Sequence, residues 1–116
     1  MNIEIEHPQP GRVIVRPQGR LDADTAQGLK KQLHEIAQAG PESVVVDMQA
    51  VDFIDSSGLS ALVSGLKALR QHGGALHLSK PQTQALTALR LTLLDRVFPI
   101  FPSVEEALSE GNLLAP

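Results

Sequence analysis

The chain has 116 residues, which suffices for one domain with a single core and leaves no room for separate catalytic and regulatory domains. Its formal net charge of -3 and its scattered Lys and Arg residues argue against nucleic-acid binding, which needs clustered basic side chains. No apolar run is long enough to span a membrane and the N-terminus lacks a signal-peptide pattern, so we expect one cytoplasmic domain over residues 1–116 that does not insert into membranes.

The first third of the chain predicts a hairpin followed by a helix. Residues 2–6 and 12–16 carry β-branched side chains among polar neighbours and are separated by the turn HPQPG, so we expect two antiparallel strands. An apolar stripe at helical spacing then predicts a helix over residues 26–37. Asp24 and Gln27 have the spacing of a capping box at the start of this helix.

The centre of the chain, residues 43–74, predicts a strand, an acidic turn and an amphipathic helix. Residues 43–48 form an apolar β-branched run, which is typical of a strand covered on both faces. The turn at residues 55–58, DSSG, leads into apolar residues that recur at helical spacing from Leu59 onward. Gly65 inside this helix costs about 1 kcal/mol relative to Ala, which indicates either close packing on a neighbouring element or close approach by a partner.

The last third continues the alternation of strands and helices. A strand at 75–79 precedes a helix that we expect Ser79 to cap, and a proline confines the strand at 97–101 to a sheet edge. Ser103 begins a short final helix, and residues 111–116 are expected to be a loose tail. This order predicts an α/β fold, with a mixed sheet of four to five strands, an N-terminal hairpin and helices largely on one face.

The DSSG turn carries the strongest functional signal. The first turn of a helix presents unpaired backbone N–H groups and the positive end of the helix dipole, which suit a capping hydroxyl or a phosphate. If Ser56 caps the helix, Ser57 remains as an accessible hydroxyl, and phosphorylation would add about -1.5 to -2 charges beside Asp55. The alternative is a capped helix start in which Gly58 serves close packing and nothing is modified.

The remaining polar residues do not indicate a catalytic or metal-binding site. Asp22 and Asp24 lie in the loop that enters the first helix and could approach the serine turn in a parallel sheet, although local capping by Asp24 and solvation of Asp22 explain them more simply. The chain has no cysteine and its four histidines are spread apart, so we expect no metal and no cofactor. Ser57 lacks a GxSxG setting and no phosphate-binding GxxxxGK[ST] loop is present, so we expect no enzyme activity.

Two segments carry a resemblance to a known family. GRLDADTA at 19–26 and VVVDMQAVDFIDSSGL at 44–59, together with the glycine pair at 73–74, resemble a STAS domain, specifically that of a bacterial anti-sigma factor antagonist. The resemblance covers nearly the whole chain, and DSSGL between a hydrophobic strand and an amphipathic helix is its most specific part. It departs at 91–101, where LTLLDRVFPIF replaces a shorter glycine-containing segment.

The resemblance implies a partner-switching function. In this family the unphosphorylated protein binds an anti-sigma factor that is also a serine kinase, and a sigma factor is thereby released. The kinase phosphorylates the antagonist to end the interaction, and a PP2C-type phosphatase restores it. By position, the resemblance makes Ser57 the phosphoacceptor and places these residues at the partner surface: Asp22, Asp24, Asp55, Ser56, Ser57 and Gly58.

Two other functions share parts of the pattern. A STAS subunit of a membrane transporter, such as an ABC-type lipid transporter, would keep the fold and have no sigma-factor role. A response-regulator receiver is suggested by Asp47 at a strand end and Lys80 after a later strand. A receiver also needs an acidic pair after its first strand and a further strand carrying Ser or Thr, and only one strand fits between Asp47 and Lys80.

Overall fold

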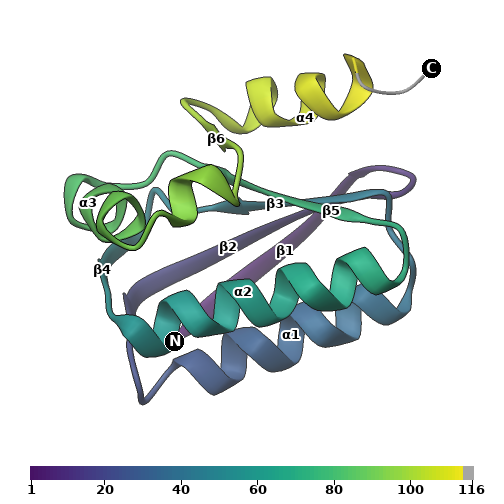
Figure 1. Ribbon diagram of the computed structural model, residues 1–116. Helices are drawn as coiled ribbons and strands as arrows, with labels where there is room; N and C mark the ends of the chain where they lie inside the picture. Colours follow the sequence, from purple (N-terminus) through teal and green to yellow (C-terminus); the bar gives the residue numbers. More distant parts are fainter. Residues whose placement is uncertain (114–116) are drawn as a thin grey trace.

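A computed structural model describes residues 1–113, with side chains described through residue 109. It contains one mixed six-stranded sheet in the order β1-β2-β3-β5-β6, and β4 pairs separately with β2 (Figure 1). The elements in chain order are β1 (Asn2–Gln9), β2 (Arg12–Leu21), α1 (Ala26–Gln38), β3 (Ser43–Asp47), β4 (Val51–Ile54), α2 (Ser56–Gln71), β5 (Ala75–Ser79), α3 (Thr83–Leu91), the 3-10 turn η1 (Leu94–Arg96), β6 (Ile100–Phe101) and α4 (Val104–Leu113).

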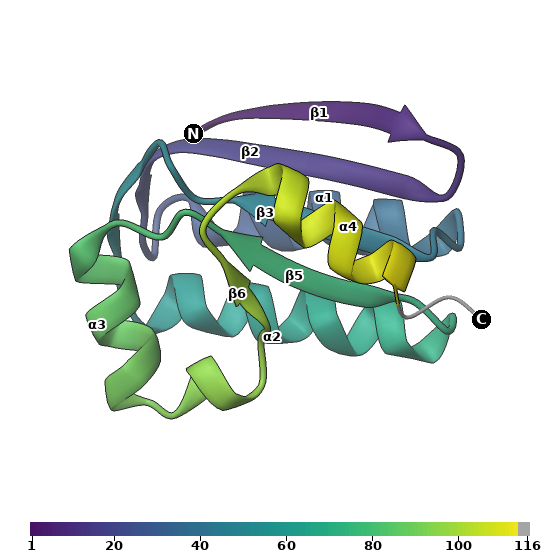
Figure 2. The same ribbon diagram turned by 90° about the horizontal axis from the view of Figure 1, so that it is seen from above.

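The predicted hairpin is confirmed, and both of its strands are longer than expected. β1 pairs antiparallel with β2 between Asn2 and Gln9, which makes β1 one edge of the sheet (Figure 2). At Gly19, whose φ is +98°, β2 stops pairing with β1 and begins to pair in parallel with β4. A glycine fits here because this backbone conformation is unfavourable for other residues. The bend carries the last residues of β2 to the end of the sheet where α1 and α2 begin.

β3 lies at the centre of the sheet, as its apolar sequence predicts. It pairs in parallel with β2 on one side and β5 on the other, and all five of its residues are buried. β6 forms the opposite edge and has only two residues. The predicted edge position is therefore confirmed, and the strand is shorter than expected because Pro99, which has no N–H to donate, immediately precedes it.

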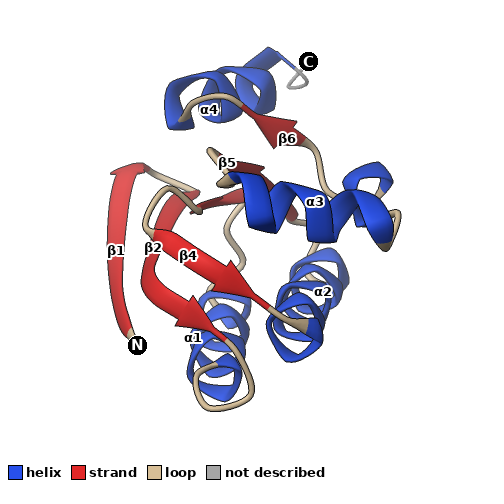
Figure 3. Cartoon of the chain, turned by 90° about the vertical axis from the view of Figure 1, so that its left-hand side faces the viewer, coloured by secondary structure: helices blue, strands red, loops and turns tan. Residues whose placement is uncertain are grey.

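The helices lie mainly on one face of the sheet, as predicted. α1 and α2 run side by side beneath the sheet and α4 lies alone on the opposite face (Figures 1 and 3). The main core joins the sheet to α1, α2 and α3, and a small second cluster joins α4 to β2 and β3. The largest fully buried side chains are Phe98, Leu21, Leu29, Leu33, Met48, Ile54, Leu62, Leu69, Leu76, Leu78, Leu89 and Val15.

The glycine inside α2 serves helix packing. A Cβ atom built on Gly65 would lie 2.5 Å from Cδ1 of Leu33 in α1, far inside van der Waals contact. A 2.8 Å hydrogen bond between His34 Nε2 of α1 and Ser64 Oγ of α2 also joins the two helices. Of the two explanations open for Gly65, the structure therefore supports close packing on a neighbouring element.

β4 was not predicted, so the expected count of four to five strands was too low. It has four residues, and the exposed Asp52 interrupts its apolar pattern. The strand pairs with the bent end of β2. On its other side the side-chain amide of Gln84 replaces a neighbouring strand, because it accepts from the Ile54 N–H and donates to the Ile54 carbonyl, both at 2.9 Å.

The predicted caps of the last two helices have different outcomes. Ser79 does not cap α3, because Lys80 adopts a φ of +52° and the helix begins only after Gln82. Ser103 does cap α4, since its Oγ accepts the Glu106 N–H at 3.0 Å. The tail expected from residue 111 is helical as far as Leu113, and its last three residues lie outside the described part of the chain.

Candidate functional site

Asp55 fixes the start of α2. It is the N-cap residue, and its Oδ1 accepts hydrogen bonds from the N–H groups of Ser57 at 2.9 Å and Gly58 at 3.1 Å. The expectation that Ser56 caps the helix is therefore wrong, because Ser56 is the first helical residue and is exposed. Asp and Ser cap helices about equally well, so composition alone could not choose between two adjacent candidates.

Gly58 lets the start of α2 approach the sheet. A Cβ atom at this position would lie 2.5 Å from the carbonyl oxygen of Leu21 and 2.7 Å from Cγ1 of Ile54. The same Leu21 carbonyl accepts the N–H of Asp55 at 3.2 Å. Any side chain at position 58 would therefore push the first turn of α2 away from the ends of β2 and β4.

Ser57 lies half-buried in a surface recess between the starts of α1 and α2. Both helices begin at the same end of the sheet (Figure 1). The recess has a volume of about 240 Å³, and we call it the serine recess. It is lined by Ala23, Ala26, Gln27, Lys30, Ser57, Ser60 and Ala61. The prediction that the first helix's entry loop approaches the serine turn is confirmed, because Ala23 from that loop lines the recess with Ser57.

The entry loop of α1 is held by hydrogen bonds between its side chains and nearby backbone groups. Asp22 Oδ1 accepts the Asp24 N–H at 3.0 Å, while Thr25 Oγ1 accepts the Asp22 N–H at 3.0 Å and donates to the Arg20 carbonyl at 2.7 Å. The expected capping of α1 by Asp24 is wrong, because Thr25 is the N-cap residue, and its side chain makes no capping hydrogen bond within the described residues. Asp24 is exposed and Asp22 is half-buried. Asp22 thus shapes the loop, and Asp24 points its charge to solvent.

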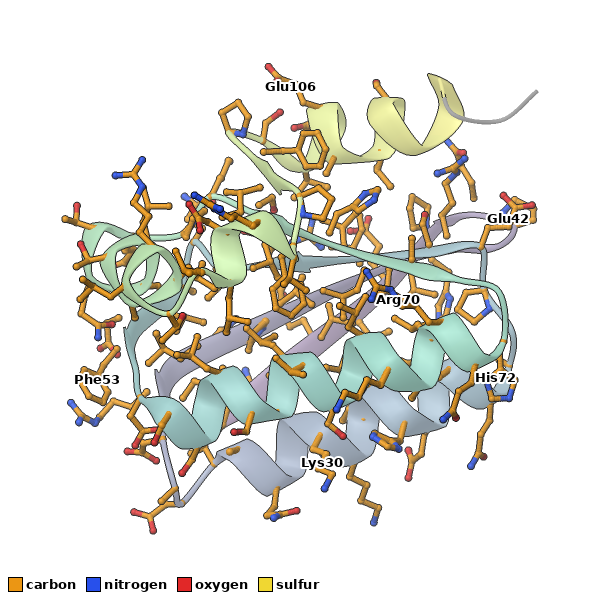
Figure 4. The ribbon with its side chains drawn as sticks, in the orientation of Figure 1. Lys30, Glu42, Phe53, Arg70, His72 and Glu106 are labelled. Carbon is orange, nitrogen blue, oxygen red and sulfur yellow. The ribbon has the colours of Figure 1, made fainter. Side chains whose placement is uncertain are left out.

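Arg20 is the neighbour of this site that the sequence did not reveal. Its guanidinium carbon lies 4.2 Å from the centre of the Phe53 ring, and its Nε donates to Asp22 Oδ2 at 3.4 Å. Phe53 lies beside the start of α2 (Figure 4). Desolvation by itself would raise the pKa of Asp22, but the hydrogen bond from the Asp24 N–H and the Arg20 contact outweigh it and lower the pKa below its usual value. Arg20 and Phe53 are far apart in sequence, and the β2–β4 pairing brings them together.

Asp47 is poorly placed for the chemistry of a receiver. It is buried, its Oδ2 accepts from Arg16 Nε at 3.3 Å and its Oδ1 accepts from the Gln49 N–H at 3.1 Å. Lys80 Nζ donates to the Gln49 side chain at 3.4 Å. Asp47 and Lys80 therefore make structural hydrogen bonds at the end of the sheet. The buried, paired carboxylate of Asp47 does not fit the phosphoacceptor that a receiver needs.

The described residues contain neither a metal-binding cluster nor a membrane-spanning helix. Within them, no three His, Asp or Glu side chains lie close enough together to hold a metal ion. Among the helices of the same residues, none is both long and apolar enough to cross a membrane.

Comparison with known proteins assigns the family. A family model described as the STAS domain matches residues 2–107. The chain belongs to the STAS domain family. The anti-sigma F factor antagonist of Paenibacillus polymyxa is 31% identical to it over 116 residues, which cover 99% of this chain and 98% of the relative.

Solved structures agree with this assignment. The protein TM1081 of Thermotoga maritima superposes with a TM-score of 0.88 at 27% identity, over 95% of this chain and 94% of the other. The anti-sigma factor antagonist SpoIIAA in its unphosphorylated form gives 0.84 at 17% identity, over 99% and 100% of the two chains. The phosphorylated form of Bacillus SpoIIAA gives 0.74 at 18% identity, over 94% and 98%. At these low identities the two SpoIIAA structures show that the fold is shared.

Proposed function

We propose that this protein is an anti-sigma factor antagonist that works as a phosphorylation-controlled partner switch, with Ser57 as the phosphoacceptor. In its unphosphorylated form it binds an anti-sigma factor that is also a serine kinase, and a sigma factor is released. Phosphorylation of Ser57 by that kinase ends the complex, and a PP2C-type phosphatase restores it. The protein acts as a binding partner and a kinase substrate, and it catalyses no reaction itself.

The accessibility of Ser57 at the start of α2 carries this proposal. The residue is half-buried, so it is held in place and still open to solvent along the serine recess. Its own N–H and that of Gly58 already bond to Asp55, so a phosphate must compete with Asp55 for these donors or project from the surface. Either outcome changes the charge of the exposed end of α2.

The electrostatic setting explains why one phosphate suffices. A phosphate brings about -1.5 to -2 charges to a surface that already holds Asp22, Asp24 and Asp55. The positive end of the α2 dipole stabilises negative charge in the first turn, so the fold tolerates the group. A partner that fits the unphosphorylated surface then meets excess negative charge. Any acidic group of that partner near Ser57 is repelled, because like charges brought together across an interface cost several kcal/mol.

Phosphate transfer with matched serine variants tests the proposal. The protein is incubated with ATP and each candidate anti-sigma factor kinase from its genome, and the modified residue is located by mass spectrometry. Ser57→Ala should abolish labelling, whereas Ser56→Ala and Ser60→Ala, which alter exposed serines in the first turns of α2, should retain it. Equal labelling of Ser57→Ala would remove this residue from the mechanism. Recovery of a transporter ATPase instead of a kinase in a pull-down would support the transporter alternative.

A further inference from the structure

A second recess lies on the other side of the first turns of α2. It runs between α2 and the segment that leads from the end of α3 into η1, and its volume is about 460 Å³. We call it the α2–η1 groove. Ser56, Ser60, Val63 and Lys67 line it from α2, and Leu94 lines it from η1. Ser60 also lines the serine recess, so the two recesses form one continuous surface around the start of α2.

Two polar groups in the groove are already satisfied from within the protein. Ser64 Oγ is hydrogen-bonded to His34 Nε2 at 2.8 Å. Thr92 Oγ1 donates to the Ala88 carbonyl at 2.8 Å. A polar group that has an internal partner does not lose a hydrogen bond when water is removed from around it. The middle of the groove can therefore be covered by apolar side chains at little polar cost.

Two exposed leucines, Leu91 and Leu93, alternate along the chain with Thr92 and Leu94, which line the α3–η1 side of the groove. The exposed fraction is 80% for Leu91 and 57% for Leu93, the two highest values among the large hydrophobic residues that the structure describes as exposed. Leu93 also has a φ of +61°, a left-handed conformation that is unfavourable for a leucine. An exposed apolar residue in a strained turn contributes little to the core, and such residues often mark interaction sites.

We propose that the anti-sigma factor that recognises Ser57 also places an apolar helical segment in the α2–η1 groove, flanked by Leu91 and Leu93. This inference rests on the proposed function and extends its contact surface. We choose the anti-sigma factor as the occupant because the groove and the serine recess are continuous. A partner that covers Ser57 and Ser60 reaches the groove without crossing another element. From Ser56 to Lys67 the groove follows α2 for about 17 Å at 1.5 Å per residue, which matches a helix of about three turns.

Lys67 would set the orientation of the docked segment along the groove. It is exposed at the end of the groove far from Ser57, and no ion pair involves it within the part of the chain whose side chains are described. A carboxylate on the partner segment is the group that complements it. The contact surface then has two parts, one at Ser57 that responds to phosphorylation and one in the groove that contributes affinity through apolar burial.

Binding measurements with a surface double variant test the groove. Leu91→Ser combined with Leu93→Gly removes both exposed side chains, and Gly suits the left-handed backbone at position 93, so the fold should be retained. We expect the dissociation constant for the anti-sigma factor kinase that labels Ser57 to rise at least about tenfold, measured by calorimetry. Lys67→Glu should weaken binding about threefold or more. The control is Ile5→Ser, which removes an exposed apolar side chain from β1 and should leave affinity unchanged.

The outcomes separate this inference from the proposed function. If the wild-type protein binds the kinase and the double variant binds within twofold of it, the groove is not a contact and Ser57 is unaffected. If the wild-type protein binds no anti-sigma factor, both proposals fail. If analytical ultracentrifugation shows a wild-type dimer that the double variant converts to a monomer, the groove holds a second copy of the chain and the inference is overturned.

Discussion

The starts of α1 and α2 adjoin the same recess and are built in different ways. The start of α2 is tied to distant parts of the chain, because Leu21 at the end of β2 accepts the Asp55 N–H and leaves no space beside Gly58. The start of α1 is held by contacts between residues close in sequence, among Asp22 and Thr25 of its loop and Arg20 at the end of β2. The partner surface thus combines a position fixed by tertiary packing with a loop whose own hydrogen bonds join residues close in sequence.

This difference assigns separate tasks to the two helix starts. A phosphoacceptor must be presented reproducibly to a kinase, and Ser57 lies two residues after Asp55, the capping residue that anchors α2 to the sheet and accepts the Ser57 N–H. The α1 loop contributes charge through Asp22 and Asp24, and its local hydrogen bonds allow it to adjust when a partner docks. Substitutions in the two regions should therefore differ in their effect on stability.

The largest contrast is expected between two glycine substitutions. Gly58→Ala would place a methyl group 2.5 Å from the Leu21 carbonyl oxygen, so we expect a loss of about 1–3 kcal/mol in the free energy of unfolding. Gly28→Ala in α1 meets no atom within 4 Å and should stabilise the protein by about 0.5–1 kcal/mol. Urea denaturation measures both values. Equal effects of the two substitutions would contradict the different construction of the two helix starts.

The capping residues should differ by a smaller amount. Asp55→Ala removes the acceptor of two backbone N–H groups and should cost about 1 kcal/mol. Asp24→Ala removes an exposed side chain that does not cap α1, so its effect should stay within about 0.5 kcal/mol. Thermal denaturation followed by circular dichroism compares the two variants. A larger loss from Asp24→Ala would mean that the α1 loop is the anchored region.

A negative charge at the switch position should change stability very little. Ser57→Asp gains from the α2 dipole and loses through repulsion by Asp55, so the free energy of unfolding should stay within about 0.5 kcal/mol of the wild type. Ser60→Asp, one turn further along α2, serves as the matched control. A loss above about 2 kcal/mol for Ser57→Asp alone would indicate that phosphorylation acts by unfolding the start of α2.

The smallest predicted effect is the acid response of the α1 loop. The pKa of Asp22 is lowered in the folded protein, so its ionised form stabilises the fold at neutral pH. This contribution is present above the ordinary pKa of 3.8 and is lost as the pH falls through the lower pKa of the folded state. Asp22→Asn should therefore flatten the loss of stability below about pH 4. Identical acid titrations of the two proteins would show that Asp22 is not stabilised in its ionised form.

The sequence predicted the elements that depend on strong, local patterns. The buried run at 43–47 and the amphipathic helix after Asp55 gave the centre of the sheet and the helix that carries Ser57. The alternation of strands and helices gave the α/β class. The penalty of Gly65 in a helix interior indicated close contact, which the structure resolves as packing on Leu33.

The features that the sequence missed depend on tertiary context. β4 is too short and too polar at Asp52 to be distinguished from a loop, and the Gln84 side chain that completes its hydrogen bonds lies thirty residues away. The capping residue of α2 could not be chosen between Asp55 and Ser56, since both types suit that role. The stacking of Arg20 on Phe53 exists only because β2 bends to meet β4.

The affinity of the anti-sigma factor kinase for the two forms of the protein tests the central claim most directly. The unphosphorylated protein and the protein phosphorylated at Ser57 are titrated against the same kinase, and circular dichroism checks that both are folded. We predict that phosphorylation weakens binding by roughly a hundredfold or more while the spectrum is unchanged. Equal affinity of the two folded forms would contradict it.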